Sequence, residues 1–98
     1  MTMITRLFRV RIHANMRDQF EQQFEQVSLP QVLAQAGLVA ASFGKPSQWT
    51  PYEYILITQW KDIESLEAFV GKQWNKAIIP KEMQKYVDQC WVHHYETD

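Results

Sequence analysis

The sequence is poor in cysteine, glycine and clustered charge, and each shortage excludes a class of function. Its one cysteine, Cys90, allows no disulfide within the chain and no cysteine-based zinc site. The three glycines, at positions 37, 44 and 71, each fall at the end of a predicted element and form no phosphate-binding loop. The net charge is −1 with both signs interspersed, so the clustered basic face that nucleic acids require is missing.

Long apolar runs are missing as well. No stretch approaches the length of a membrane-spanning helix, and residues 1–5 lack the apolar core of a secretory signal. Those five residues look like a common expression-vector leader, so we leave them out of the fold prediction as a disordered or vector-like segment. The composition predicts a cytoplasmic protein that contacts neither nucleic acid nor membrane.

Material for a core is plentiful. The chain has 98 residues, of which 46% are hydrophobic and 13% aromatic, and we predict one domain over residues 1–98. Four tryptophans are many for so short a chain. Two interpretations are open: a core rich in tryptophan, or a pocket or partner surface that buries some of the rings.

Residues 52–60 carry the clearest local signal. The run is aromatic and β-branched and ends in Trp60, which predicts a strand. Asp62 is placed to cap a following helix over residues 62–70, and Gly71 to close it in the left-handed conformation. The helical spacing is set by Ile63, Leu66, Phe69 and Val70.

The remaining elements follow from alternation and from helix breakers. Residues 5–13 alternate and predict a strand, with one set of side chains turned toward the helices (Phe8, Val10, Ile12) and the other away (Leu7, Arg9, Arg11, His13). A helix over residues 17–36, kinked at Pro30 and closed by Gly37, comes next. We then expect a strand over 38–44, a loop over 45–51, an irregular segment over 72–80, a short helix near Met83 and Tyr86, and a last strand over 89–95.

This order, βαββαβ, predicts an α+β protein with the ferredoxin-like arrangement: a four-stranded antiparallel sheet with both helices on one face. The strand over 52–60 is apolar on both sides, with Tyr54, Leu56 and Trp60 on one and Ile55 and Ile57 on the other. A strand that is apolar on both faces is expected to be covered on both. The sequence therefore predicts a homodimer.

The order and spacing of these features resemble the antibiotic biosynthesis monooxygenase family over about residues 7–95. The matching features are the helix with Phe20 and Phe24, its stop at Ala36 and Gly37, and Trp60 followed two residues later by an acid. The resemblance implies a dimeric α/β barrel in which two subunits pack their bare sheet faces together and each has a pocket. It also implies activities such as cofactor-free oxygenation of phenols, quinols and anthrones, or degradation of haem.

The haem-degrading branch resembles this sequence poorly. That branch has a tryptophan in the second helix, where Phe69 stands here, and a haem-ligating histidine in the segment that follows. No histidine lies between His13 and His93 in this chain. We therefore expect no cofactor, and the absence of clustered ligands predicts no metal site.

Cofactor-free oxygenation requires a base, donors that stabilise the substrate anion, and a dry apolar pocket. Histidine suits the first role because its pKa is close to working pH. His93 shares a face of the last strand with Trp91 and Tyr95, and we expect that set to face the barrel, whereas His94 goes with Cys90 and Val92. We thus predict His93 as the catalytic base and Trp91, Trp74, Arg11 and His13 as substrate-binding residues.

Each of these residues also has a plain structural interpretation. His93 could be an interface histidine, His13 a surface residue near a loop, and Trp74 a ring that covers the core. Arg9 and Arg11 could form rim ion pairs with Glu53 or a hydrogen bond with Gln59. Two functions therefore stay open: a cofactor-independent monooxygenase that acts on a small aromatic, quinol or polyketide-like substrate, or a non-catalytic dimer of the same fold that binds small molecules.

Overall fold

The computed structural model of the protein describes residues 2–76, 79 and 81–97. Within these residues, four strands and six helical segments follow one another. The strands are β1 (Met3–Ile12), β2 (Leu38–Gly44), β3 (Glu53–Trp60) and β4 (Val87–Thr97). The helical segments are η1 (Ala14–Met16), α1 (Arg17–Gln23), η2 (Phe24–Ser28), α2 (Leu29–Leu33), α3 (Ile63–Val70) and η3 (Lys81–Tyr86).

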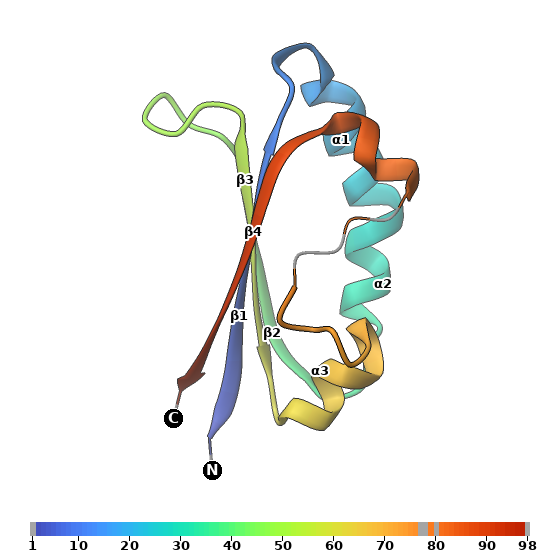
Figure 1. Cartoon of the computed structure of the whole chain (residues 1–98), viewed down its shortest axis with the longest axis vertical. Helices are drawn as coiled ribbons and strands as arrows, with labels where there is room; N and C mark the ends of the chain where they lie inside the picture. Colours follow the sequence, from blue (N-terminus) through green and yellow to red (C-terminus); the bar gives the residue numbers. More distant parts are fainter. Residues whose placement is uncertain (1, 77–78, 80, 98) are drawn as a thin grey trace.

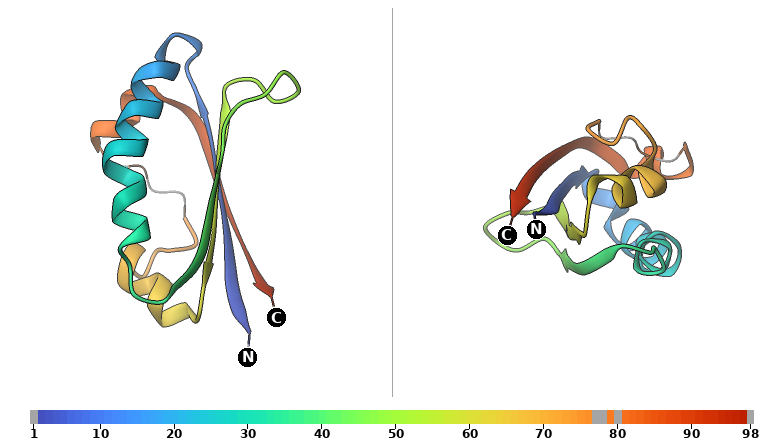
Figure 2. Two further views of the ribbon diagram at one scale, coloured as in Figure 1. Left: turned by 180° about the vertical axis from the view of Figure 1, so that it is seen from behind. Right: turned by 90° about the horizontal axis from the view of Figure 1, so that it is seen from below.

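The strands form one sheet in the order β2-β3-β1-β4, and every neighbouring pair is antiparallel. The described helices all lie on one face of this sheet, and the described part of the chain leaves the other face uncovered (Figures 1 and 2). The predicted α+β, ferredoxin-like topology is confirmed. None of the described helices is long and apolar enough to span a membrane.

The sheet begins earlier than the sequence suggested. Met3 is the first residue of β1 and pairs with Thr97, and Ile4 pairs with both Trp60 and Glu96. The N-terminal residues 3–5, which we left out as part of a leader segment, therefore belong to the central strand. Backbone pairing on both sides holds them in place whatever the origin of their sequence.

The predicted facing of the strands is confirmed. Val10 and Ile12 are 3% and 2% exposed and lie on the face that the helices cover. Tyr54 and Trp60, each 1% exposed, lie on that same face of β3. Leu7 and its cross-strand neighbour Ile57 point to the bare face and stay partly exposed in the single chain.

The elements α1, η2 and α2 follow one another without a gap and form one long helical segment over residues 17–33. This segment is interrupted where the sequence predicts a kink. Pro30 has no N–H group, so the carbonyl one turn earlier loses its usual donor. The chain responds with a π turn directly before the proline, η2, in which the N–H of Leu29 donates to the carbonyl of Phe24. Wide turns of this kind are short local features within otherwise regular helices.

The helix α3 begins where the sequence predicts, directly after Asp62. The carboxylate of Asp62 accepts a hydrogen bond from the Ser65 N–H at 2.8 Å, which caps α3. Gly71 closes α3 with φ of +88°, but its ψ of −179° is extended, so the predicted left-handed helical closure is wrong. Gly37 also has positive φ, and any side chain there would collide with Ser65.

Aromatic rings fill the space between the helices and the sheet. Phe24 stacks on Phe43 with ring centroids 4.5 Å apart, and Phe20 lies 4.7 Å from the ring of Tyr54. At the opposite end of the sheet, Trp60 stacks on Phe69 of α3 at 5.6 Å. These contacts join the helix layer to the sheet at both ends.

Replacement of Trp60 by alanine should lower the free energy of unfolding by about 3–5 kcal/mol, because it leaves a cavity beneath α3. Denaturant unfolding measures the change. Trp49→Ala is the matched control, since Trp49 is 81% exposed and its loss should change stability by less than about 0.5 kcal/mol. Equal effects of the two replacements would contradict the packing described for Trp60.

Candidate functional site

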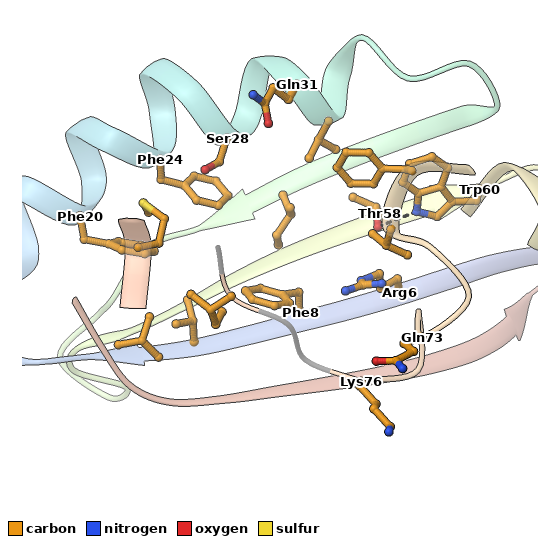
Figure 3. A pocket seen from close by; sticks show the side chains of 18 residues that line it. Arg6, Phe8, Phe20, Phe24, Ser28, Gln31, Thr58, Trp60, Gln73 and Lys76 are labelled. Atoms are coloured by element: carbon orange, nitrogen blue, oxygen red, sulfur yellow. Dashed lines mark hydrogen bonds between the residues drawn. The ribbon is translucent and has the colours of Figure 1, made fainter. Parts of the chain in front are cut away.

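A cavity of about 360 Å³ lies between the helices and the covered face of the sheet. Its walls come from β1, β3, the long helical segment, α3 and the segment after α3 (Figure 3). Most lining side chains are apolar, and five are aromatic: Phe8, Phe20, Phe24, Trp60 and Phe69. Such a mainly apolar space with few polar groups is typical of small-molecule sites.

The π turn η2 forms part of this wall. Phe24 and Ser28, its first and last residues, both line the cavity, and Gln31 lines it one turn further on (Figure 3). The widened turn thus places one ring and one hydroxyl toward the same space. Such turns occur often at functional sites.

The charged side chains in the described lining of the cavity are all basic. Arg6 and Lys76 are the charged residues among the described lining side chains, which include no carboxylate. Arg6 lies on the central strand β1 and is only 9% exposed. Figure 3 shows Arg6 near Thr58 and Trp60, with Phe20 and Phe24 toward the other end.

The contacts of Arg6 satisfy only part of its guanidinium group. One Nη1 N–H donates to the carbonyl oxygen of Trp74 at 3.1 Å, and the cation lies 5.9 Å from the ring centroid of Phe8. Within the described part of the chain Arg6 forms no ion pair. Burial lowers its pKa to about 10, so it remains a cation at neutral pH. A buried, unpaired cation beside a cavity is suited to hold an anion.

His94 lies next to Arg6 on β4, outside the lining of the cavity. The two residues are register partners across β1 and β4, and the imidazole meets the indole of Trp74 edge-on with centroids 4.7 Å apart. Its Nε2 atom is buried without a hydrogen-bond partner among the described residues. Desolvation, with the positive charge of Arg6 and the neighbouring His93, lowers the pKa of His94 to about 4.

Trp74 contacts both Arg6 and His94 and connects them to α3. Its carbonyl accepts from Arg6, and its indole N–H donates to the carboxylate of Glu67 on α3 at 3.2 Å. The segment after α3 is thereby tied to both the central strand and α3. Trp74 itself does not line the cavity; Gln73 and Lys76 from the same segment do.

The five residues predicted for the site lie elsewhere. His93 and Trp91 point to the bare face, as their register with Leu7 and Arg9 shows. There the indole of Trp91 lies between two guanidinium groups, 5.0 Å from that of Arg9 and 5.4 Å from that of Arg11.

Side chains on the bare face pair with one another. Arg9 forms the expected ion pair with Glu53 at 3.0 Å, whereas Arg11 donates to Gln89 at 2.6 Å. His13 is exposed just beyond β1. The cavity is thus on the opposite side of the sheet from His93, Trp91 and Arg11, whereas Trp74 lies on the same side as the cavity but outside its lining. The role of the predicted set in a site stays a prediction.

Sequence reasoning missed Arg6 and Thr58. The signal was present, since Arg6 precedes Phe8 by two residues and Thr58 precedes Trp60 by two, which places both on the covered face. A charge at a core position is easily passed over in favour of its apolar neighbours. In the described part of the chain no cluster of three metal-ligating side chains occurs.

The family model of the antibiotic biosynthesis monooxygenases matches residues 3–87. That span includes β1, β2, β3, every described helical segment and all the described lining residues of the cavity. The chain belongs to this family. Membership supports a role as a monooxygenase or a small-molecule-binding protein.

Solved structures agree on the fold. A protein from Shewanella oneidensis is 14% identical with a TM-score of 0.79, over 98% of this chain and 91% of that one. A conserved protein from Methanosarcina mazei is 17% identical with a TM-score of 0.77, over 97% and 92% of the two chains. A variant of MhuD with two manganese protoporphyrin IX molecules bound per active site is 15% identical with a TM-score of 0.72, over 96% and 93%. A comparison with curated proteins finds no match.

The lowered pKa of His94 predicts how stability depends on pH. The unfolded chain protonates this histidine near pH 6.5, whereas the folded chain resists protonation until about pH 4. The unfolded state therefore binds more protons between these values, and the free energy of unfolding should fall as the pH is lowered through that window. The full contribution is present above about pH 6.5.

Denaturant unfolding between pH 7 and pH 4 measures this dependence. His94→Gln should flatten the profile relative to the wild type, because it removes the titrating group. His93→Gln removes only the smallest of the three contributions that lower the pKa of His94, so it should keep most of the slope. A wild-type slope that survives in His94→Gln would contradict a buried, neutral His94.

Proposed function

We propose that the chain is a cofactor-independent monooxygenase that acts on a small aromatic, quinol or polyketide-like molecule bound in the cavity. The observation that carries this proposal is the buried Arg6, a cation without an acidic partner among the described residues, at one end of an aromatic-lined space. An ionised phenol or enol would bring its ring to the apolar walls and its oxygen to Arg6. A cavity of about 360 Å³ falls within the range of small-molecule sites.

The chemistry requires that the substrate be present as its electron-rich anion. A guanidinium beside the ionising oxygen favours the anion and so lowers the pKa of the substrate. The anion passes an electron to dioxygen. The two radicals that result combine through a C–O bond, which gives a hydroperoxide. Loss of water then breaks the O–O bond. One oxygen atom stays on the substrate, the second leaves as water with two substrate hydrogens, and the substrate supplies every electron.

Removal of the proton is the step for which the sequence suggested His93. That residue is exposed on the bare face, and the lining residues that the structure describes include no histidine. His94, beside Arg6, is neutral at pH 7 and able to accept a proton, but its pKa of about 4 makes it a weak base. Stabilisation of the anion by Arg6 would therefore carry most of the ionisation.

The second candidate is a binding protein without turnover, which the same cavity would serve. Haem, held as a manganese analogue by the MhuD variant, suits this cavity poorly, because its described lining offers no histidine, cysteine or tyrosine to ligate iron. Dioxygen consumption separates the two candidates. Tight binding of aromatic anions without consumption of dioxygen would favour the binding protein.

Oxygen uptake with a panel of dihydroxy-aromatics, anthrones and quinols tests the monooxygenase. Arg6→Gln should lower turnover of the accepted substrate by roughly 10²–10³-fold, as loss of a donor to a developing oxyanion does. Arg17→Gln is the matched control, because Arg17 is an exposed arginine of α1 that does not line the cavity and should leave turnover unchanged. Equal turnover in Arg6→Gln and the wild type would contradict the proposal.

Two further variants in that assay locate the base. If the reaction uses His93 on the bare face, His93→Ala should lower turnover by roughly 10²–10⁴-fold. If the reaction occurs in the cavity without that residue, His93→Ala keeps turnover and His94→Ala lowers it. Full activity in both variants would exclude histidine catalysis on β4.

We also propose that the chain forms a homodimer through the bare face of the sheet. Leu7, Ile55 and Ile57 lie partly exposed on this face, and Tyr95 is 53% exposed. Polar residues of the same face already pair with one another, such as Arg9 with Glu53. A second sheet could therefore cover the apolar centre without burial of an unpaired charge.

Light scattering at micromolar concentration should give about twice the 11.7 kDa mass of one chain. Ile57→Glu should shift the protein toward the monomer, because it places a charge at the centre of the contact. Leu33→Glu is the control: Leu33 is 57% exposed on the helix side and should leave the mass unchanged. A well-folded wild-type monomer would contradict the dimer.

A further inference from the structure

The hydroxyl group of Thr58 is a second polar group in the cavity, and its hydrogen-bonding capacity is only half used. Its Oγ1 accepts a hydrogen bond from the indole N–H of Trp60 at 2.9 Å. The side chain is 3% exposed, and the hydroxyl donates to no acceptor in the described part of the chain. Because a hydroxyl can both accept and donate, its hydrogen is left for a ligand in the cavity.

Thr58 and Arg6 are placed to act together. They are direct register partners across β3 and β1, and both line the cavity. Side chains at directly opposed positions of an antiparallel pair have Cβ atoms roughly 4.5–5.5 Å apart. A guanidinium has no acceptor atom, and the hydrogen of the Thr58 hydroxyl is a free donor beside it. Arg6 and Thr58 therefore present adjacent donors to the cavity, and Gln73 adds an amide that can donate or accept.

Trp60 determines the direction of the Thr58 hydroxyl. Its indole is 1% exposed and stacks on Phe69, so the ring has no freedom to turn its N–H elsewhere. With that N–H directed at Oγ1, the hydroxyl hydrogen must point away from the indole. A donor that is itself hydrogen-bonded through its oxygen also becomes a stronger donor.

We propose that Arg6 and Thr58 bind an anionic, acceptor-only edge of the substrate, in which two adjacent oxygens share one negative charge, and that Trp60 is the positioning residue for Thr58. An aromatic carboxylate and an ionised phenol flanked by a carbonyl group both have this chemistry. The inference rests on the cavity of the proposed function and narrows its substrate class. Neutral molecules rich in hydroxyl groups would leave the buried charge of Arg6 without a counter-charge and should bind more weakly.

Calorimetric titration with three naphthalene probes tests the donor pair. The probes are 2-naphthoate, 2-acetyl-1-naphthol and the neutral 2-naphthylmethanol. Thr58→Val should weaken binding of 2-naphthoate about 10- to 100-fold, the usual effect for a hydrogen bond to a charged group, and the neutral probe only about two- to fourfold. Thr58→Ser, which keeps the hydroxyl, should restore most of the affinity.

The two anionic probes separate the two sources of the oxygen edge. Preference for 2-naphthoate assigns a carboxylate, and preference for 2-acetyl-1-naphthol, rising with pH as the phenol ionises, assigns an ionised phenol with its neighbouring carbonyl. Either preference supports the donor pair if the preference is lost in Thr58→Val. Equal loss of all three probes in Thr58→Val would show damage to the cavity and overturn the proposal.

A double-mutant cycle tests the role of Trp60. Trp60→Phe keeps a ring on Phe69 but removes the N–H, and it should weaken binding of 2-naphthoate by about threefold. In the Thr58→Val background the lost N–H has no hydroxyl to orient, so the same change should weaken binding less than it does in the wild type. Additive losses would assign Trp60 a merely structural role and overturn this part of the proposal.

Failure of this inference is distinct from failure of the monooxygenase. If 2-naphthoate binds as described and no substrate leads to consumption of dioxygen, the result supports the donor pair and contradicts the monooxygenase. If Thr58→Val consumes dioxygen at the wild-type rate, the result contradicts the donor pair and supports the monooxygenase. Absence of wild-type binding to both anionic probes at about 1 mM, the level of very weak affinity, would also overturn the donor pair.

Discussion

The covered face of the sheet depends on how the fold accommodates one buried cation. Arg6 lies on the central strand among apolar neighbours, where an unpaired charge is costly. The structure provides a backbone carbonyl from Trp74, the ring of Phe8 and open space. The carbonyl requires the segment after α3 to lie across the sheet, and the Trp74 indole fixes that segment to Glu67. The same charge helps to keep His94 neutral.

The backbone topology was predictable because its causes are local. Alternation in residues 5–13 fixes which face of β1 is covered, and the Asp62 cap fixes where α3 begins. The ends of the strands were less predictable. Residues 3–5 joined the sheet because strands on both sides offered hydrogen-bond partners, which is information held elsewhere in the chain.

The site was predictable only in part, and the reason lies in the geometry of the sheet. The side of each β4 residue followed correctly from alternation, so His93 and Trp91 do face away from the helices. The expectation that the pocket lies on that side came from the implied dimer barrel and not from the residues of one chain. Where an internal cavity lies depends on how far the helices sit from the sheet. That distance follows from many side-chain volumes together, and no sequence pattern reports it.

The π turn before Pro30 has a consequence for the length of the chain. An α-helical turn closes over four residues and this one over five, so the wall of the cavity contains one residue more than a regular helix would need. A regular α-helical turn over these same residues would rotate everything beyond it by about 100° about the helix axis, and Val32 would turn out of the core. Deletion of one residue between Phe24 and Pro30 would instead remove the wide turn and keep the later residues in phase. Residue count in this segment, and not only residue type, therefore decides which side chains reach the cavity.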